Sequence, residues 1–315
     1  MKGKILLIDT IHSSFKTSLE QQGFICDEGY AMSKDEILSI LKEYNGVVIR
    51  SRFKIDADFL SRATHLKFIA RAGAGMENID AEAATKHGIQ LINAPEGNRD
   101  AVGEHAIGML LALLNHLIRA DKEVRQGIWK REENRGEEIQ GKTIGIIGFG
   151  NMGTAFAKKL QGFEVNMLVY DPYINIDKQQ YPYVQQVSMD VIFEQADVIS
   201  LHIPLTSETN KMVNADFLSK FKKPIRIINT ARGKVVETAA LTEAMKAGKV
   251  IGAALDVLEY ELISFENIDA SQLPEPFQYL INSERVILSP HIGGWTHESN
   301  EKIAQTLVKK IIKLY

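Results

Sequence analysis

The stretch GKTIGIIGFGNMGTAFAKKLQGFEVNMLVYD, residues 141–171, determines the fold that we expect for the rest of the chain. It contains an apolar strand at Thr143 to Ile147, the turn GFGNMG at 148–153, a helix from Thr154 to Gln161, and a second strand from Val165 to Tyr170. In such a turn the first glycine permits a tight bend and the second lets the backbone approach a pyrophosphate. The third lets the helix pack closely on the strand. We therefore predict a dinucleotide-binding βαβ unit with the phosphates at the helix N-terminus.

An acidic residue, Asp171, follows the second strand, 18 residues after Gly153. A carboxylate at this point accepts hydrogen bonds from ribose hydroxyls and repels a 2′-phosphate. Residues 172–176 contain no Arg or Lys that would offset the repulsion. The sequence therefore favours NAD over NADP. The predicted contacts of this stretch with NAD are Gly148, Gly150, Asn151, Met152, Gly153 and Asp171.

The length and composition indicate an ordinary globular protein of two domains. A chain of 315 residues exceeds the size, about 250–300 residues, at which single hydrophobic cores divide. The net charge of −3, without a long run of one sign, argues against a nucleic-acid partner or a membrane-surface patch. The single cysteine, Cys26, cannot form an intrachain disulfide, and Met1 to Lys4 leads directly into the apolar run Ile5 to Ile8. We expect a cytoplasmic location and a structural role for the Cys26 thiol.

Short apolar runs alternate with amphipathic stretches along most of the chain, which predicts parallel strands joined by crossover helices. One series of this kind precedes the glycine turn and has no such fingerprint of its own, so we expect it to form a separate domain. Its second helix is predicted to begin with a capping box, because Ser33 is followed three residues later by Glu36. The last helix, His297 to Leu314, is expected to pack back on this first domain.

The segment Ala101 to Arg125 is predicted to be a helix that connects the two domains. Its core, Ala106 to Leu114, is apolar on nearly every face, so we expect burial all round and a part in a subunit interface. The apolar core is too short for a membrane span, which needs about 18 residues or more. The charged segment Gln126 to Glu138 that follows is either a solvated loop or an arm that reaches a neighbouring subunit.

Polar clusters follow three predicted strands, and they contain Arg232, Glu261 and His291. Each residue alone has a simple structural explanation, as a strand cap, a solvated acid or a loop residue. The carboxyl ends of parallel strands, however, form the edge of the sheet at which ligands bind. Arginine offers a bidentate fork for a carboxylate, and histidine beside a glutamate is an acid/base pair. The set suits the reduction of a 2-keto acid, with Glu259 as the competing acid.

Eight motifs carry a resemblance to a known family: IRSRFKI, ARAGAGMENIDAEAATKHGI, NAPEGNRDAVGEHAIGMLLAL, GKTIGIIGFGNMG, LHIPLTSET, NTARGKVVE, GAALDVLEYE and LSPHIGG. The chain resembles the D-isomer specific 2-hydroxyacid dehydrogenases, and within them the D-3-phosphoglycerate dehydrogenases of serine biosynthesis. The resemblance implies an α/β fold of two Rossmann-like doubly wound domains with a cleft between them. These are a flavodoxin-like substrate domain, residues 1–98 plus 296–315, and an NAD-binding Rossmann domain, residues 99–295. It also implies NAD as cofactor, no metal ligand, and a homodimer or larger homo-oligomer.

The same resemblance assigns roles to individual residues. Arg232, Glu261 and His291 occupy the catalytic positions. Further contacts with NAD are expected from His202, Ile203, Pro204, Thr209, Thr230, Ala231, Asp256, His291, Gly293 and Gly294. Contacts with the substrate are expected from Arg50, Ser51, Arg52, Ala72, Gly73, Ala74, Arg232 and His291. Two guanidinium groups at Arg50 and Arg52 would suit a phosphate, and the alternative is that both arginines face solvent.

Some features depart from the family pattern. Leu262 replaces the proline that commonly follows the catalytic glutamate, and the segment from Glu261 to His291 is longer than usual. Trp295 stands where small residues are common in phosphoglycerate dehydrogenases, so we expect a bulkier wall there. The chain ends soon after its last helix, and we do not expect regulation by serine through an added domain.

Three other functions stay open. Two lie within the same class: a glyoxylate or hydroxypyruvate reductase, and a D-lactate-type dehydrogenase. The third is an NAD-sensing, non-catalytic scaffold, which the lack of interaction-rich tails disfavours.

Overall fold

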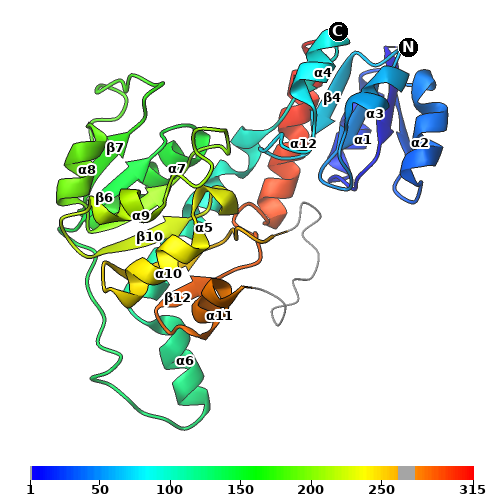
Figure 1. Ribbon diagram of the computed structural model, residues 1–315. Coiled ribbons are helices and arrows are strands. Elements are labelled where there is room, and N and C mark those ends of the chain that lie inside the picture. The colour runs from blue at the N-terminus through cyan, green and yellow to red at the C-terminus, as the bar shows by residue number, and fades with distance from the viewer. Residues whose placement is uncertain (1, 262–273) are drawn as a thin grey trace. The chain divides into compact units, whose positions relative to one another are not determined.

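The computed structural model describes residues 2–261 and 274–315 (Figure 1). The chain divides into two compact units: unit 1 comprises residues 1–100 and 295–315, and unit 2 comprises residues 101–294. The expected limits, 1–98 with 296–315 and 99–295, lie within two residues of these boundaries. Leu262 and the residues after it, to 273, lie outside the described part.

Unit 1 contains a five-stranded parallel sheet in the order β2-β1-β3-β4-β5. This is the strand order of flavodoxin-like folds and confirms the predicted class. The strands are β1 Gly3–Leu7, β2 Phe24–Glu28, β3 Gly46–Ile49, β4 Phe68–Arg71 and β5 Gln90–Ile92. The helices are α1 Ser14–Gln21, α2 Lys34–Ile40, α3 Ala57–Arg62, α4 Ala81–Lys86 and α12 His297–Ile312, with a 3-10 turn η1 at Leu41–Glu43.

Helices cover both faces of this sheet, because successive residues of a strand point to opposite faces. On one face, Leu19 of α1 and Leu307 of α12 belong to a core cluster with alternate residues of β1. On the other face, Ile37 of α2, Phe59 of α3 and Ala84 of α4 belong to a second cluster. The C-terminal helix therefore packs on the first strands of the chain, as the sequence predicted.

The N-terminus of α2 confirms the predicted capping box. The Glu36 amide donates to Ser33 Oγ at 3.3 Å, and the Ser33 amide donates to Glu36 Oε2 at 2.6 Å. The hydrogen bond from the Ser33 amide and a second one from the Ser33 hydroxyl, at 2.8 Å to Glu36 Oε2, lower the pKa of the Glu36 carboxyl.

Unit 2 contains a seven-stranded parallel sheet in the order β12-β11-β10-β9-β6-β7-β8. The strands are β6 Thr143–Ile147, β7 Asn166–Tyr170, β8 Gln185–Gln186, β9 Val198–Leu201, β10 Ile225–Asn229, β11 Val250–Leu255 and β12 Val286–Leu288. The chain runs outward from β6 through β7 to β8, and then returns to β9 on the other side of β6. The sheet therefore has the Rossmann arrangement, with its topological switch point between β6 and β9.

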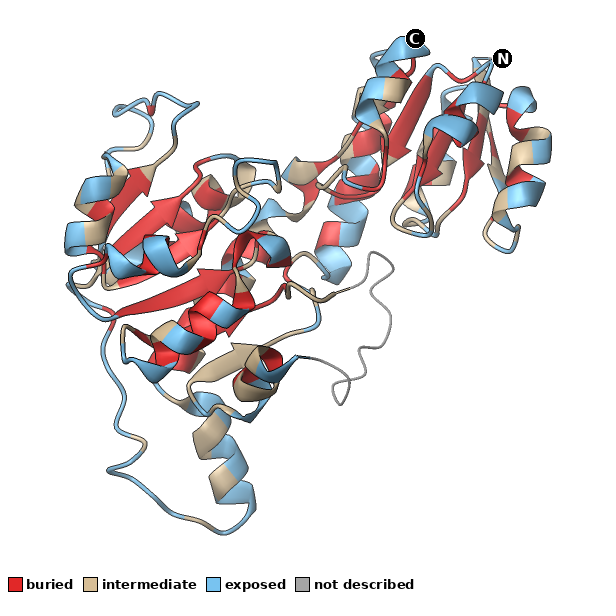
Figure 2. Cartoon of the chain, viewed as in Figure 1, coloured by how far each residue is buried: buried red, intermediate tan, exposed pale blue. Residues whose placement is uncertain are grey.

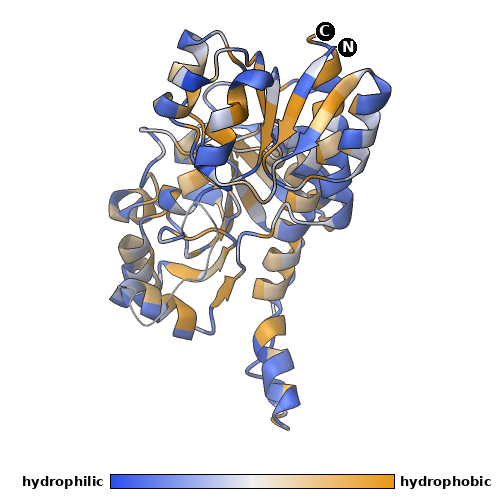
Figure 3. Ribbon diagram, turned by 90° about the vertical axis from the view of Figure 1, so that its right-hand side faces the viewer, coloured by the Kyte–Doolittle hydropathy of each residue, from blue (hydrophilic) through white to orange (hydrophobic). Residues whose placement is uncertain are grey.

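The helices of unit 2 also form two layers. They are α5 Pro95–Leu114, α6 Leu117–Arg125, α7 Asn151–Leu160, α8 Met189–Gln195, α9 Ala215–Ser219, α10 Thr238–Lys246 and α11 Glu275–Asn282, with 3-10 turns η2 Gln161–Phe163 and η3 Gly233–Val235. The helices α5 and α7 pack on one face of the sheet, and α8, α9, α10 and α11 pack on the other. The central strands β6, β9, β10 and β11 are buried in Figure 2 and mostly apolar in Figure 3, whereas the edge strands β8 and β12 are not buried.

The connecting helix was predicted incorrectly in its second half. Instead of one helix from Ala101 to Arg125, the structure has α5 and α6, which are bent by 63°. The break falls at His116, whose φ of 51° is left-handed and ends the helical path. The apolar stretch Ala106 to Leu114 in α5 buries one face, and Gly108 is exposed, so the predicted burial all round is not found in this chain. The helix α6 contains no buried residue and extends away from the sheet of unit 2 (Figures 1 and 3).

Among the described residues, no single helix is long and apolar enough to cross a membrane. Only the bent pair α5 and α6, taken together, meets the criterion of length and composition.

Candidate active site

The three glycines of the GFGNMG turn occupy three different environments. Gly148 has φ of 92°, and a Cβ there would lie 2.5 Å from the carbonyl oxygen of His202. A Cβ on Gly153 would lie 2.0 Å from the carbonyl oxygen of Gly148, whereas a Cβ on Gly150 would meet nothing within 4 Å. The outer two glycines therefore permit close packing, and the middle glycine leaves open space beside the backbone.

The start of α7 follows this open position directly. Gly150 is the N-cap residue, and no side chain caps the helix there. Asp171 lies beside the turn, because its Oδ2 accepts from the Phe149 amide at 2.8 Å and its Oδ1 from the Tyr173 amide at 2.9 Å. An uncapped helix N-terminus favours phosphate, and the acid lies at the position expected for ribose recognition. These residues fit a dinucleotide.

Two buried polar atoms at the ends of β9 and β10 support the same ligand. Within the described part of the chain, neither His202 Nδ1 nor Thr230 Oγ1 has a hydrogen-bond partner. His202 Nε2 is 2.9 Å from Ser200 Oγ, and burial lowers the pKa of the imidazole to about 3. The ring is therefore neutral near pH 7. Buried polar atoms without partners are rare and favour a ligand that supplies them.

The loop after β9 uses its polar groups internally. The Thr209 hydroxyl donates to the Pro204 carbonyl at 2.6 Å and accepts from the Thr206 amide at 2.8 Å. Ile203 packs against the core of unit 2. Ile203, Pro204 and Thr209 were predicted to contact NAD, and in the structure their contacts hold the loop in shape. The Thr209 hydroxyl already has a donor and an acceptor within the loop.

The turn that carries Arg232 is held by Asn229, a buried residue that the sequence analysis did not select. Asn229 Oδ1 accepts from the Ala231 amide at 3.0 Å, and its Nδ2 donates to the Arg232 carbonyl at 3.0 Å. A Cβ on Gly233 would lie 1.9 Å from the Leu258 carbonyl oxygen. The Arg232 turn therefore packs directly on the turn that leads to Glu261. An asparagine at the end of a predicted strand is the sequence signal that could have identified Asn229 as the residue that holds this turn.

The structure brings His291 and Glu261 together. Nδ1 of His291 lies 3.3 Å from Glu261 Oε1, with 26% and 21% of the two side chains exposed. The competing acid, Glu259, points elsewhere: it accepts from the Thr238 amide at 2.8 Å and lies 3.4 Å from Lys211 Nζ. His291 therefore lies beside Glu261 and not beside Glu259.

The loop that carries His291 is organised by Asp256, whose side chain is 2% exposed. The carboxylate accepts from Ser289 Oγ at 2.6 Å, the Ile292 amide at 2.9 Å and the Gly293 amide at 2.8 Å. His105 Nε2 of α5 lies 3.2 Å from Asp256 Oδ1. Burial raises the pKa of Asp256, but the hydrogen bonds from His105, Ser289 and the two amides outweigh it, so the pKa is lowered. His105 and Ser289 were not predicted as site residues.

In unit 1 the loop Arg50-Ser51-Arg52 is tied to Asp9. Asp9 Oδ2 accepts from the three backbone amides of this loop at 2.6, 3.1 and 3.3 Å. These three amides therefore stabilise the loop by donating to Asp9 within unit 1.

The two arginine side chains of this loop differ. Arg52 Nη1 donates to the carbonyls of Ile8 at 3.0 Å and Gly29 at 3.1 Å, and its Nη2 donates to the Met32 carbonyl at 2.6 Å. The Arg50 guanidinium lies 4.5 Å from the ring centre of Trp295, an exposed side chain. Arg52 is exposed, but its guanidinium donates to three backbone carbonyls and so does not offer all its donors to a phosphate, whereas the half-buried Arg50 is stacked on an indole.

The glycine-rich turn after β4 has a different form from GFGNMG. Gly73 has φ of 147°, and its amide donates to the Arg71 carbonyl at 2.8 Å. The Arg71 side chain lies over this glycine, because a Cβ on Gly73 would be 1.7 Å from Arg71 Nη1. The Ala74 carbonyl accepts from Asn93 Nδ2 at 2.7 Å. The predicted substrate turn is thus rigid and has a cation at its surface.

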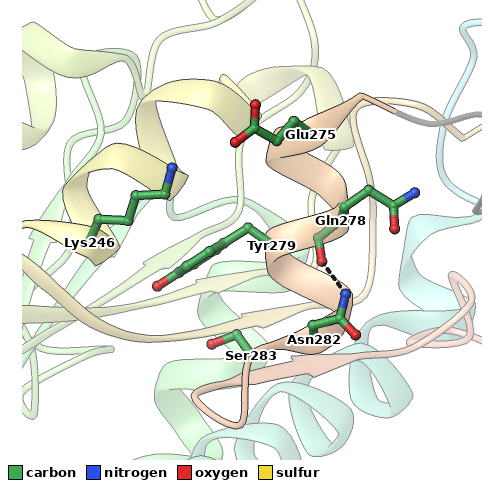
Figure 4. Close-up of a pocket in the computed structure, with 6 residues that line it drawn as sticks. All are labelled: Lys246, Glu275, Gln278, Tyr279, Asn282 and Ser283. Atoms are coloured by element: carbon green, nitrogen blue, oxygen red, sulfur yellow. Dashed lines mark hydrogen bonds between the residues drawn. The ribbon is translucent and has the colours of Figure 1, made fainter.

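A surface pocket elsewhere in unit 2 contains none of the predicted site residues (Figure 4). It is lined by α10, α11 and the residue after α11: Lys246, Glu275, Gln278, Tyr279, Asn282 and Ser283. Lys246 is paired with Glu243 at 2.9 Å, so the pocket has no evident chemistry. Across residues 2–261 and 274–315, no cluster of three His, Cys, Asp or Glu could hold a metal.

Comparison with known proteins agrees with this geometry. Residues 107–293 match the family described as D-isomer specific 2-hydroxyacid dehydrogenase, NAD binding domain. The chain belongs to this family, as the sequence motifs predicted, and residues 107–293 correspond to its NAD-binding domain.

Two relatives show the range within the family. A D-3-phosphoglycerate dehydrogenase from Archaeoglobus fulgidus is 35% identical over 311 residues, covering 99% of this chain and 57% of that protein. A hydroxypyruvate reductase from Thermotoga maritima is 37% identical over 282 residues, covering 90% of this chain and 88% of that protein. This chain therefore spans little more than half of the first relative.

One solved structure has the same fold as this chain over nearly the full length of both proteins. The D-lactate dehydrogenase from Aquifex aeolicus, complexed with NAD and lactic acid, matches with a TM-score of 0.83 at 27% identity, covering 99% of this chain and 95% of that one.

Proposed function

We propose that this protein catalyses the NAD-dependent interconversion of a D-2-hydroxy acid and a 2-keto acid. The proposal rests chiefly on the His291–Glu261 pair at 3.3 Å, carried by loops at the carboxyl edge of an NAD-binding sheet. An imidazole beside a carboxylate is the arrangement that general acid/base catalysis requires. Membership of the 2-hydroxyacid dehydrogenase family supports the same chemistry.

Each residue has a defined task in this mechanism. NAD, when bound, supplies or accepts the hydride at C2 of the substrate. Arg232 would bind the substrate carboxylate and polarise the C2 oxygen through its guanidinium donors. His291 would donate the proton to that oxygen during reduction and take it back during oxidation, with Nε2 as the exchanging atom. Glu261, beside Nδ1, would orient the imidazole and stabilise the imidazolium.

The cofactor-binding residues have matching tasks. The GFGNMG turn and the N-terminus of α7 would hold the pyrophosphate, and Asp171 the adenosine ribose. His202 and Thr230 would bind polar groups toward the nicotinamide end, whereas the buried Asp256 carboxylate would act only by holding the loop beside it. Because Asp171 is acidic, NAD is expected to be preferred over NADP.

For the substrate, we propose D-3-phosphoglycerate and 3-phosphohydroxypyruvate. The similarity to the Archaeoglobus fulgidus phosphoglycerate dehydrogenase supports it. So does Arg50, because a guanidinium stacked on Trp295 keeps the N–H donors at its edge available for a phosphate.

A second candidate is hydroxypyruvate or glyoxylate as the substrate. The observation that favours it is the commitment of Arg52 to three backbone carbonyls, which leaves one arginine where two were expected to bind phosphate. The similarity to the Thermotoga maritima hydroxypyruvate reductase points the same way.

A substrate panel decides between them. The measurement is kcat/KM with NADH for phosphohydroxypyruvate, hydroxypyruvate, glyoxylate and pyruvate. We expect phosphohydroxypyruvate to be preferred, and Arg50→Ala to lower kcat/KM for it about 10–100-fold, the effect of about 1.5–3 kcal/mol for a lost charged hydrogen bond. The same variant is expected to leave hydroxypyruvate nearly unaffected. Arg62→Ala, which removes an exposed arginine paired with Asp58, is the matched control.

His291→Gln tests the activity itself. We expect kcat to fall about 10²–10⁴-fold, because a general acid is removed. NADH binding, followed by fluorescence, should persist. A protein that binds NADH but reduces none of the four keto acids would be the non-catalytic scaffold instead.

We also propose that the protein assembles as a homodimer or larger homo-oligomer through α6. Leu117, Ile118 and Val124 are 53%, 61% and 51% exposed, and Trp129 in the next segment is 77% exposed. An apolar set of this kind is typical of a subunit contact. Light scattering should show an oligomer that Ile118→Asp dissociates, whereas a monomeric wild type would reject the proposal.

A further inference from the structure

We propose that His105, on α5, is a positioning residue for the proposed reaction: through Ser289 and Asp256 it holds the loop that presents His291. The inference rests on the proposed dehydrogenase function. His105 does not touch the reacting atoms in this mechanism. It acts through two buried groups that define the path of the catalytic loop.

The His291 loop needs such support because its backbone conformation is unfavourable. His291 has φ of 56°, in the left-handed region that costs a residue with a Cβ about 1 kcal/mol or more. Its amide donates to the Asp256 carbonyl at 2.8 Å and lies 3.0 Å from the Ser289 carbonyl oxygen. The next two amides, of Ile292 and Gly293, donate to the Asp256 carboxylate. The conformation of His291 is thus fixed from both sides by Asp256.

The Asp256 carboxylate in turn depends on donors from its surroundings. Ser289 Oγ donates to Asp256 Oδ1 at 2.6 Å, which uses the one proton of that hydroxyl. His105 Nε2 lies 3.0 Å from Ser289 Oγ and 3.2 Å from Asp256 Oδ1. Because the serine oxygen and the carboxylate both act as acceptors toward this nitrogen, His105 carries its proton on Nε2.

The result is a chain of donation from α5 to the catalytic loop. His105 donates to Ser289 and Asp256, Ser289 donates to Asp256, and Asp256 accepts the amides on the far side of His291. Removal of His105 would take away one of the four donors to a carboxylate that is 2% exposed, and would remove the donor that Ser289 Oγ accepts from. The loop would relax, and a small displacement of a catalytic group lowers the rate strongly.

Gly293 makes this packing tight. A Cβ on Gly293 would lie 2.7 Å from Asp256 Oδ2 and 3.5 Å from His105 Cδ2. The absence of a side chain at Gly293 therefore permits the close approach of the loop to Asp256 and His105.

Three variants at two positions of α5 test the proposal. His105→Leu removes the donor, and His105→Gln places an amide donor near the position of Nε2. Met109→Leu is the matched control, because Met109 is a buried residue one turn further on, and its Sδ lies 3.9 Å from the same Ser289 Oγ. We expect His105→Leu to lower kcat about 10–100-fold. His105→Gln should recover most of this loss, and Met109→Leu should be close to wild type.

Two measurements distinguish a displaced His291 from a general loss of protein stability. The solvent deuterium isotope effect on kcat should rise in His105→Leu, because a misplaced His291 makes proton transfer more rate-limiting. In protein labelled with ¹³C at histidine, the Cε1–H resonance of His291, assigned by its absence in His291→Gln, should move in His105→Leu and stay in place in Met109→Leu.

The outcomes are distinct. The proposal is wrong if His105→Leu keeps kcat and the His291 resonance unchanged, or if Met109→Leu loses as much activity as His105→Leu. It is also wrong if His105→Gln gives no recovery while its thermal midpoint matches wild type. Should the wild type reduce no 2-keto acid, the proposed function fails. The resonance of His291 still tests the positioning contact in that case.

Discussion

The two units each carry a glycine-rich turn after a buried strand, yet the turns are built differently. In unit 2, Gly148 to Gly153 leads at once into α7, and two of its glycines are required by contacts of 2.5 Å or less. In unit 1, residues 72–75 follow β4, and no helix begins until α4 at Ala81. There the main neighbour of Gly73 is the flexible end of the Arg71 side chain.

The comparison shows that glycine content alone does not specify the ligand. A glycine turn at a helix N-terminus provides aligned amides and a partial positive charge that suit a pyrophosphate. A glycine turn without a helix, with an arginine folded over it, suits a smaller anion such as a carboxylate. Three predictions on the glycines test this difference, and a further one concerns the buried His202 beside the turn of unit 2; they run from the largest expected effect to the smallest.

Gly153→Ala should destabilise unit 2 by about 3 kcal/mol or more, because the new methyl would meet the Gly148 carbonyl oxygen at 2.0 Å. The measurement is the free energy of unfolding in urea. An unchanged midpoint would show that α7 can move away from β6, and that the close packing is not needed.

The stability of unit 2 should fall at acid pH because of His202. Burial lowers the pKa of its imidazole in the folded chain to about 3, from an ordinary value of 6.5. Between these values the unfolded chain binds a proton that the folded chain does not, so stability is lost as the pH falls through this window. Lowering the pH from 7 to 5 should reduce the free energy of unfolding by up to about 2 kcal/mol.

The control for this pH dependence is a pair of variants. His202→Gln should flatten the dependence, whereas His87→Gln, at an exposed histidine, should keep it. Equal slopes for both variants would mean that another group controls the acid sensitivity.

Gly150→Ala should leave stability almost unchanged, because a Cβ there meets nothing within 4 Å and the φ of −73° is ordinary. The methyl would nevertheless occupy the space that we assign to the pyrophosphate. We expect NADH affinity, measured by fluorescence titration, to fall about tenfold, or about 1.4 kcal/mol. Unaltered affinity would place the cofactor away from this turn.

Gly73→Ala should affect the keto acid and spare the cofactor. The substitution displaces the Arg71 guanidinium and strains a backbone with φ of 147°. We expect KM for the keto acid to rise about threefold, equivalent to about 0.6 kcal/mol, with the NADH Kd unchanged. A change in the NADH Kd instead would remove the proposed division of tasks between the two turns.

The strands and the glycine fingerprint were predictable because their signals are local. The predicted strand Thr143 to Ile147 has the same limits in the structure, and the predicted strand Val165 to Tyr170 begins one residue later, at Asn166. A buried parallel strand is apolar at nearly every position, so its run of residues is easy to identify. Ser33 and Glu36 formed their capping box for the same reason, because both partners lie within one turn.

The errors and omissions arose from contacts that are distant in sequence. His116 adopts a left-handed conformation that ends the helical path of α5, and a histidine in the sequence does not predict such a conformation. His105 and Ser289 are 184 residues apart, so their hydrogen bond is visible only in the fold. Arg52 was expected to bind a substrate phosphate, but its guanidinium donates to three backbone carbonyls of its own unit.

The single cysteine gives this molecule a built-in reporter of unfolding. Cys26 is 3% exposed in unit 1, and burial raises the pKa of its thiol to about 12, so the folded chain should resist thiol reagents. The two tryptophans are divided between the units, with Trp295 in unit 1 and Trp129 in unit 2. The rate of thiol labelling would then time the opening of unit 1 alone, without any engineered label. Both indoles are already exposed in the folded chain, at 65% and 77%, so the buried thiol would report unfolding more sharply than tryptophan fluorescence.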